Sequence, residues 1–283
     1  MFYLLVPDTG GVVNNNKRSK SLVQTLTNGT VAHEYQHLIN ASRRLYVNGV
    51  GTAFEERWLD EGLSHIAEEL GFFRAANRSP RTNIDATAFG DPLFVSAYSV
   101  FAINNFRRYA IYLGSPETQA PIGFDAGDDD LATRGAIWSF LRYAADHLPA
   151  GADSQFWFNL VNSKTSGMAN LTAALGSGSP PAPLLHDWAI SVFLDDNSTN
   201  VDPRYLQPSW NARSVLTGGG LSTAFPLLTR TLSDNVQTSL NVVGYGVAFL
   251  RFSVANGQDA LLTVTSNGQP LPPTMQVSVV RVR

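Results

Sequence analysis

Cysteine is absent from this 283-residue chain, and lysine nearly so, with only Lys17, Lys20 and Lys164. Without cysteine there is no disulfide framework and no thiolate-bound zinc, so any metal ion needs His, Asp or Glu ligands. The net charge of −3 provides no basic field, which argues against nucleic acid or an anionic membrane as a partner. No apolar run approaches the roughly 18 residues of a spanning helix, so no membrane span is expected.

The composition is that of a globular protein, with 44% hydrophobic and 15% charged residues. The length allows one large domain or two smaller ones. Asn, Ser, Thr and Gly are plentiful, as is common in secreted bacterial proteins. The N-terminal MFYLLVPDTGG lacks the basic start and the cleavage site of a signal peptide. We therefore expect a cytoplasmic protein or a fragment of a longer precursor, and favour a secreted or cell-surface protein whose signal peptide is not in this chain.

Helical patterns fill the first two-thirds of the chain. The first run covers residues 21–48, and Gly29 leaves open whether it is one helix or two. The second, residues 54–72, is expected to end at Gly71. A buried strand is predicted at the N-terminus for FYLLV, residues 2–6. Further helices are predicted over residues 91–114, 127–151, 153–163, 167–176 and 182–196.

The pattern changes near Ser214, where short runs of Val, Leu, Thr and Phe alternate with ANGQ and SNGQ turns. Such alternation predicts the strands of a small β-sandwich. We therefore divide the chain into residues 1–213, a mainly helical catalytic region, and residues 214–283, an all-β sandwich-like accessory domain.

The segment TVAHEYQHLIN contains His33, Glu34 and His37 in the order H-E-x-x-H. Residues four apart lie on one helix face, about 6 Å apart along the axis, so both histidines can reach one metal ion. Glu34 is then beside the metal, as suits a general base acting on water. A catalytic zinc needs a third protein ligand. The alternative is a polar helix face with two surface histidines.

Downstream, RWLDEGLSHIAEE (residues 57–69) makes the chain resemble the gluzincin metallopeptidases. In these families a glutamate on the next helix completes H-E-x-x-H, and the resemblance implies Glu61 as the third ligand. AHEYQHLIN, HDWAISVFLDD and QPSWNARSV look most like the hyicolysin-type bacterial peptidases, over about residues 1–215. The resemblance implies a mainly α catalytic domain of the zincin (α+β) type. It also implies more N-terminal sheet than this chain has, which favours a truncated chain.

The chain departs from the gluzincin pattern next to the third ligand. Asp60 precedes Glu61 where Asn is common, and His65 stands where thermolysin-like members place an Asp that supports a ligand histidine. A neutral histidine adds no negative charge behind the metal. Asp60 and His65 are therefore candidates for outer-shell roles, and Asp60, Glu68 or Glu69 could supply the missing charge.

A second departure concerns the oxyanion that develops during peptide hydrolysis. In the aminopeptidases a Tyr precedes a Gly-Ala pair at a helix start, and here Arg134 precedes that pair. Arg134 is therefore our candidate for electrostatic stabilisation of the transition state. Other candidates, each more commonly a core or surface residue, are Tyr98, Tyr143, His147 and His186.

Two acidic loops, residues 125–130 and 195–202, hold several oxygen donors that calcium could use. Neither has the spacing of a known calcium loop. Helix capping and solvation explain them better, so zinc is the expected cofactor and calcium is not favoured.

The predicted function is therefore zinc-dependent hydrolysis of peptide bonds, most simply by an endopeptidase acting on proteins or peptides. His33, His37 and Glu61 bind zinc, and Glu34 takes the proton from the attacking water. The FYLLV strand would provide a sheet edge for substrate. One alternative is an inactive peptidase-fold protein that binds partners or surfaces. The other is a zinc hydrolase of non-peptide substrates.

Overall fold

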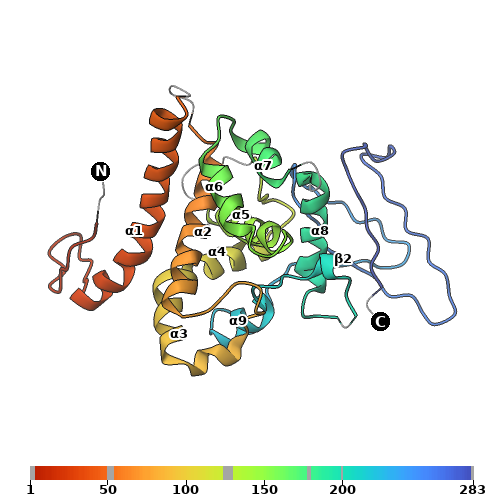
Figure 1. Ribbon diagram of the computed structural model, residues 1–283. Helices are drawn as coiled ribbons and strands as arrows, with labels where there is room; N and C mark the ends of the chain where they lie inside the picture. The colour runs from red at the N-terminus through yellow and green to blue at the C-terminus, as the bar shows by residue number, and fades with distance from the viewer. Residues whose placement is uncertain (1–3, 50–53, 124–129, 177–179, 199, 282–283) are drawn as a thin grey trace.

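The computed structural model describes residues 4–49, 54–123, 130–176, 180–198 and 200–281. Within these residues the chain is mainly helical, as predicted for its first two-thirds (Figure 1). The helical elements are α1 (Lys20–Ser42), the π-turn η1 (Arg43–Val47), α2 (Arg57–Ala75), η2 (Ala86–Gly90), α3 (Pro92–Ala97), the π-turn η3 (Tyr98–Ala102), α4 (Ile103–Leu113), α5 (Leu131–Asp146), α6 (Asp153–Val161), α7 (Gly167–Leu175), α8 (Pro181–Leu194), η4 (Pro203–Tyr205) and α9 (Ala212–Gly218).

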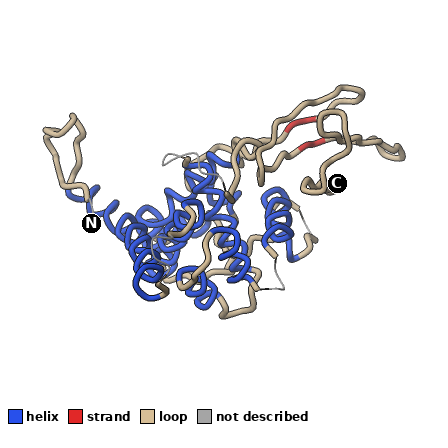
Figure 2. Tube along the Cα trace, turned by 90° about the horizontal axis from the view of Figure 1, so that it is seen from above, coloured by secondary structure: helices blue, strands red, loops and turns tan. Residues whose placement is uncertain are grey.

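The helices that position the candidate site stack in the order α1, α2, α5, α4. Helix α1 lies at the outer edge of the molecule and packs on α2 (Figure 1). The other side of α2 packs on α5, which in turn packs on α4. Viewed from above, the helices form one body, and the C-terminal loops project from it on the side away from the N-terminus (Figure 2). The predicted site residues on α1 and α2 therefore share one helix interface.

Two glycines that the sequence suggested as helix breaks lie inside helices. Gly29 is within α1, which is one continuous helix, and Gly71 is within α2, which ends four residues later than predicted, at Ala75. A Cβ atom at residue 29 would be 2.5 Å from the carbonyl oxygen of Val100, and one at residue 71 would be 3.0 Å from the Phe101 ring. Both glycines therefore allow close approach of η3, a tertiary requirement that the local pattern does not reveal.

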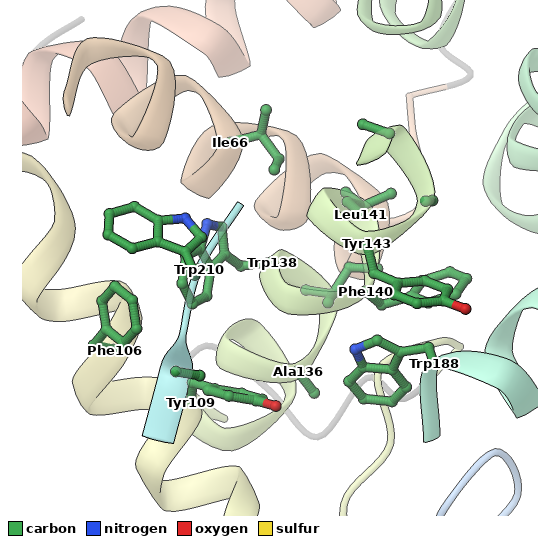
Figure 3. Packing of buried hydrophobic residues seen from close by; sticks show 14 of the residues in the cluster. Ile66, Phe106, Tyr109, Ala136, Trp138, Phe140, Leu141, Tyr143, Trp188 and Trp210 are labelled. Carbon is green, nitrogen blue, oxygen red and sulfur yellow. The ribbon is translucent and has the colours of Figure 1, made fainter. Parts of the chain in front are cut away.

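The core is centred on α5, which is buried on nearly every side. Aromatic rings from several elements meet there in edge-on and tilted contacts (Figure 3). The Phe106 ring lies 5.1 Å from Trp138 and 5.0 Å from Trp210 between centroids, and Tyr112 lies 5.7 Å from Trp188. These contacts join α4, α5, α8 and the segment before α9, and the joined elements support α2.

A buried network of charged and polar groups joins α5, α2 and residues 209–210. Arg142 on α5 pairs with Glu69 on α2 at 2.6 Å and with Asp146 at 3.5 Å. Glu69 also accepts a hydrogen bond from the Trp210 indole at 2.7 Å, and Asp146 accepts two from Ser209. Burial raises the pKa of Glu69 even with Arg142 beside it, so the carboxylate depends on this arginine for its charge.

Replacing Arg142 should therefore be strongly destabilising. We expect Arg142→Met to lower the free energy of unfolding by about 3–5 kcal/mol, because two buried carboxylates lose their cation. The matched control is Arg78→Met, which removes an exposed pair with Asp91 and should cost no more than about 1 kcal/mol. Urea unfolding measures both. Equal losses in the two variants would contradict the role assigned to Arg142.

The C-terminal region does not form the predicted β-sandwich within its described residues. Residues 214–281 contain one pair of parallel two-residue strands, β1 (Arg230–Thr231) and β2 (Leu250–Arg251). Apolar side chains of the predicted strands remain exposed, for example Leu261 at 93% and Val279 at 67%. Alternating sequence produces a sandwich only when a second layer covers the apolar face, and no such layer is present in this described segment.

The first part of this region belongs instead to the helical body. The predicted boundary at residue 213 falls inside α9, whose Val215 and Leu216 are fully buried in the core. Further along, Arg230 pairs with Glu117 through two hydrogen bonds, and the Val247 amide donates to the Pro116 carbonyl. Residues 228–247 are thus attached to the loop that follows α4.

The strand predicted at the N-terminus is also not formed where the structure describes it. Residues 1–3 lie outside the described part, and residues 4–6 are exposed and form no strand. They have no partner strand nearby within the described residues, since the first pairing is an isolated bridge between Asp8 and Arg18. Among the helices described, none combines the length and apolar character needed to cross a membrane.

Candidate metal site

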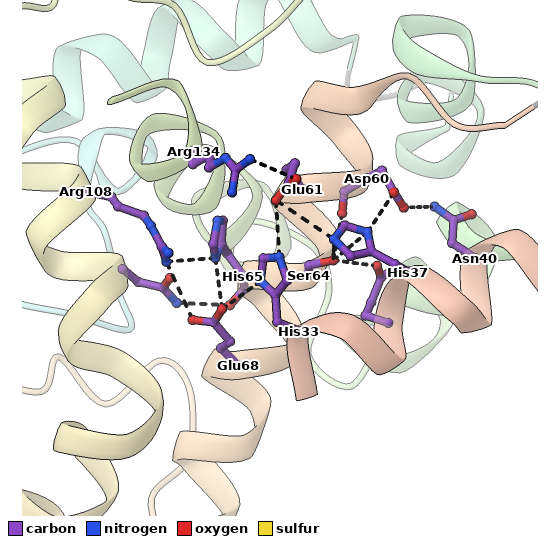
Figure 4. A network of polar contacts seen from close by, with 12 residues as sticks. His33, His37, Asn40, Asp60, Glu61, Ser64, His65, Glu68, Arg108 and Arg134 are labelled. Atoms are coloured by element: carbon purple, nitrogen blue, oxygen red, sulfur yellow. Dashed lines mark hydrogen bonds and ion pairs between the residues drawn. The ribbon is translucent and has the colours of Figure 1, made fainter. Parts of the chain in front are cut away.

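Helix α1 presents its two motif histidines to α2. His33 is buried and His37 half-buried, and their rings lie 4.9 Å apart between centroids at an angle of 79° (Figure 4). One helical turn separates them, so both side chains lie on the same face of α1. The helix begins at a side-chain cap, where the Ser19 hydroxyl accepts the Leu22 amide.

Helix α2 brings Glu61 to the same space. One carboxylate oxygen, Oε2, lies 3.2 Å from His33 Nε2 and 4.0 Å from His37 Nε2. This oxygen is buried and accepts no hydrogen bond from the protein. The three ligands that the sequence predicts for a metal are therefore brought together, around an oxygen that lacks a hydrogen-bond donor.

The donor set and its spacing fit a zinc ion. Ligand atoms about 2.0–2.1 Å from a tetrahedral zinc lie roughly 3.3 Å from one another. The distance from His33 Nε2 to Glu61 Oε2, 3.2 Å, matches this spacing, whereas the distance from His37 Nε2, 4.0 Å, is longer than a bound zinc would require. Two imidazoles and one carboxylate form a common ligand set of catalytic zinc sites, and the chain has no cysteine that would compete for the ion.

Asp60 supports one of the ligand histidines. Its Oδ2 lies 2.7 Å from His37 Nδ1, and its Oδ1 accepts a hydrogen bond of 2.6 Å from the Asn40 amide. A carboxylate at Nδ1 holds the proton there, which leaves the Nε2 lone pair for a metal. The structure thus places the predicted outer-shell residue Asp60 against His37.

Glu68 supports His33 in the same way. Its Oε1 lies 2.7 Å from His33 Nδ1 and 3.2 Å from His65 Nδ1. The sequence left Glu68 and Glu69 as alternatives for this charge. Their positions on α2 distinguish the two residues. Glu68 is seven residues after Glu61 and therefore lies on the same face of the helix. Glu69 pairs with Arg142 instead.

His65 also lies at the site, although not as a direct support for a ligand. It is fully buried one turn after Glu61, and its ring is 4.8 Å from the His33 ring between centroids. Ligand atoms of His33, Glu61 and His65 all lie within 4.8 Å of one another. His37 is not part of this group and approaches it through Glu61, with its Nε2 atom 4.0 Å from Oε2.

Two arginines reach the site from the helices behind α2. Arg134 on α5 lies 3.1 Å from Glu61 Oε1, the oxygen on the far side of the carboxylate from the histidines. Arg108 on α4 lies 3.3 Å from His65 Nδ1 and 3.9 Å from Glu68 Oε2. Arg134, the candidate for transition-state stabilisation, is thus next to the third ligand. Arg108 was not expected from the sequence, because no local pattern connects residue 108 with α2.

These contacts shift the pKa values of the site. Burial opposes the charge on His33, but the neighbouring carboxylates of Glu61 and Glu68 outweigh it and raise the His33 pKa to about 9. Burial likewise opposes ionisation of both glutamates, but His33 and Arg134 lower the Glu61 pKa to about 2, and His65 and His33 lower that of Glu68 to about 2. Both carboxylates are therefore ionised at neutral pH, as a bound cation requires, whereas His33 carries a proton that a metal ion would displace.

Glu34, the predicted general base, follows His33 on α1 and its side chain is exposed to solvent. At about 100° per residue, it is rotated by about 60° from His37 on the side away from His33. The other oxyanion candidates lie in different surroundings. The Tyr143 hydroxyl donates to the Arg204 carbonyl, the His147 ring contacts the Tyr143 and Pro203 carbonyls, His186 contacts Ser278, and Tyr98 is buried among phenylalanine rings.

In the described residues of the two acidic loops, aspartates cap helices as expected. Asp130 caps α5 by accepting the Thr133 amide, and Asp202 caps η4 by accepting the Arg204 amide. Asp195 accepts the Gln207 amide. The rest of the first loop, residues 125–129, lies outside the described residues.

Comparison of the chain with protein-family models, with curated proteins and with solved structures finds no match. A proposal of function therefore depends on the residues of this site and on their geometry.

Loss of the charge behind His37 should weaken metal binding. We expect Asp60→Asn to lower zinc affinity about 10–100-fold, because the amide can still accept the His37 hydrogen bond but carries no charge. Competition with a chelator measures the affinity. Asp187→Asn, which alters a carboxylate beside the remote His186, is the control and should have no effect. Unchanged affinity in Asp60→Asn would show that Asp60 does not support a metal ligand.

Proposed function

We propose that this protein is a zinc-dependent peptidase whose helical body is a zincin-type catalytic region. The observation that carries the proposal is the convergence of His33 Nε2 and His37 Nε2 on Glu61 Oε2, a buried oxygen without a hydrogen-bond donor. A buried anionic oxygen next to two imidazole nitrogens is poorly solvated by the protein alone, and a cation satisfies all three atoms.

Each residue then has a defined task. His33, His37 and Glu61 hold the ion, and Asp60 and Glu68 orient the two histidines through their Nδ1 atoms. Zinc bound there supplies a Lewis acid that polarises a carbonyl and lowers the pKa of water. Glu34, exposed on α1 beside His33, accepts the proton from the attacking water and passes it to the leaving amine. Arg134 holds the outer oxygen of Glu61 and adds positive charge where the oxyanion develops.

The substrate class follows from the same arrangement. A base beside a Lewis acid is suited to hydrolysis of an amide, and α1 lies at the edge of the molecule, where an extended chain can reach the site. We therefore propose proteins or peptides as substrates and endopeptidase action. The residues that follow α9 are proposed as an accessory region, and secretion or cell-surface location is proposed from the composition.

Zinc content provides the first test. We expect about one zinc ion per chain in the purified wild type and far less in His37→Ala, because two remaining ligands bind zinc weakly. His147→Ala serves as control, since this histidine contacts backbone carbonyls away from the site. Absence of zinc from the wild type after incubation with the metal would overturn the proposal, and a non-enzymatic binding protein would then be the better interpretation.

Activity provides the second test. Glu34→Gln should keep the zinc and lose peptide hydrolysis by about 10²–10⁴-fold, since the amide cannot accept the proton. Unfolded proteins are the substrates to assay, beside small amides and esters. Full activity in Glu34→Gln would show that Glu34 is not the base. Hydrolysis of the small esters without any cleavage of proteins would favour a hydrolase of non-peptide substrates.

A further inference from the structure

His65 has the features of a metal ligand rather than of a core histidine. It is fully buried, on the same face of α2 as Glu61 and one turn beyond it. Its Nε2 atom is buried and has no hydrogen-bond partner. A ligand atom of His65 lies within 4.8 Å of those of both His33 and Glu61. An unsatisfied nitrogen in this position is costly unless something binds it.

The tautomer of His65 can be inferred from its neighbour Glu68. The same oxygen, Glu68 Oε1, contacts Nδ1 of His33 at 2.7 Å and Nδ1 of His65 at 3.2 Å. An ionised carboxylate only accepts hydrogen bonds, so it favours an Nδ1–H on both rings. Each ring, in its neutral form, then carries its lone pair on Nε2. With Asp60 at His37 Nδ1, three histidines of the site have a carboxylate at Nδ1, the arrangement usual for metal-bound imidazoles.

The contact with Arg108 does not favour the other tautomer of His65. Its guanidinium lies 3.3 Å from His65 Nδ1 and could donate a hydrogen bond there if the proton moved to Nε2. That tautomer would leave a buried N–H without an acceptor. The Nδ1–H tautomer leaves a lone pair instead, which a cation can satisfy, and Arg108 then acts through its ion pair with Glu68.

We propose that His65 is a fourth protein ligand of the metal, so that the resting site consists of three imidazoles and the Glu61 carboxylate. This inference rests on the proposed function, since it assumes that His33, His37 and Glu61 bind zinc. Catalytic zinc sites usually keep one coordination position open, and sites with four protein ligands are usually structural. The proposal therefore assigns His65 a regulatory role, in which hydrolysis requires a fifth coordination position or the departure of His65.

Zinc K-edge X-ray absorption of the full chain tests this directly, because it reports the number of imidazoles around the ion. We expect three imidazoles in the wild type and two in His65→Gln. His186→Gln is the matched control and should keep three, since His186 contacts Asp187 and Ser278 instead. The chain has only five histidines, so the assignment has few alternatives.

Two imidazoles in zinc-loaded wild type would overturn the fourth-ligand proposal and leave the proposed function intact. Absence of bound zinc would overturn both. The wild-type count needs no variant, so the test stands even if His65→Gln fails to fold. Chelator competition adds a second readout, in which His65→Gln should lose at least about tenfold in zinc affinity. Three imidazoles in both proteins would show that the third is not His65.

Discussion

The packing of α1 on α2 is the constraint on which the rest of the structure depends, because it buries ionisable groups that need partners. His33, Glu61, His65 and Glu68 are all withdrawn from water in this interface. An isolated buried charge costs several kcal/mol, so such an interface is stable only if opposite charges and hydrogen bonds meet accurately. The contacts between imidazoles and carboxylates meet this need in part, and Glu61 Oε2, His65 Nε2 and Gln36 Nε2 are among the atoms left without a hydrogen-bond partner.

The helices behind this interface hold α2 in place. Arg134 and Arg108 approach the two glutamates of the site from α5 and α4, while Arg142 holds Glu69 on the other face of α2. Every carboxylate that α2 buries thus has an arginine from the core. The aromatic packing around Trp138 and Trp210 fixes the helices that carry these arginines. The rigidity of the site follows from this core, because precise ligand positions require supporting groups that do not move.

The unsatisfied atoms are informative because the rest of the site is well paired. His37, His33 and Asn40 each have a carboxylate partner within 2.7 Å. Side chains that merely shared a polar helix face would be exposed and would not need such partners. This pairing of imidazoles with carboxylates supports the proposed metal site.

Local features of the sequence determined much of this molecule. Helical periodicity predicted α1, α2, α4 and α5, and the spacing of H-E-x-x-H placed His33 and His37 on one face, because both depend only on residues a few positions apart. Asp60 could be suspected from its place beside Glu61. The sequence did not distinguish Glu68 from Glu69, and it did not show that His65 is fully buried or that Arg108 reaches α2. It left the role of Gly29 open, and it misled at Gly71 and in the predicted β-sandwich.

Those outcomes were decided by the tertiary structure alone. Which face of α2 meets α1 and which meets α5 depends on contacts between residues 30–140 positions apart, as with the bonds from Glu68 to His33 and from Trp210 to Glu69. A glycine within a helix, or an apolar run after Ser214, has the same local pattern whether or not another element packs against it. The sequence by itself therefore determined the helices and the ligand types, and only the packing of the helices decided which charges and imidazoles share one buried space.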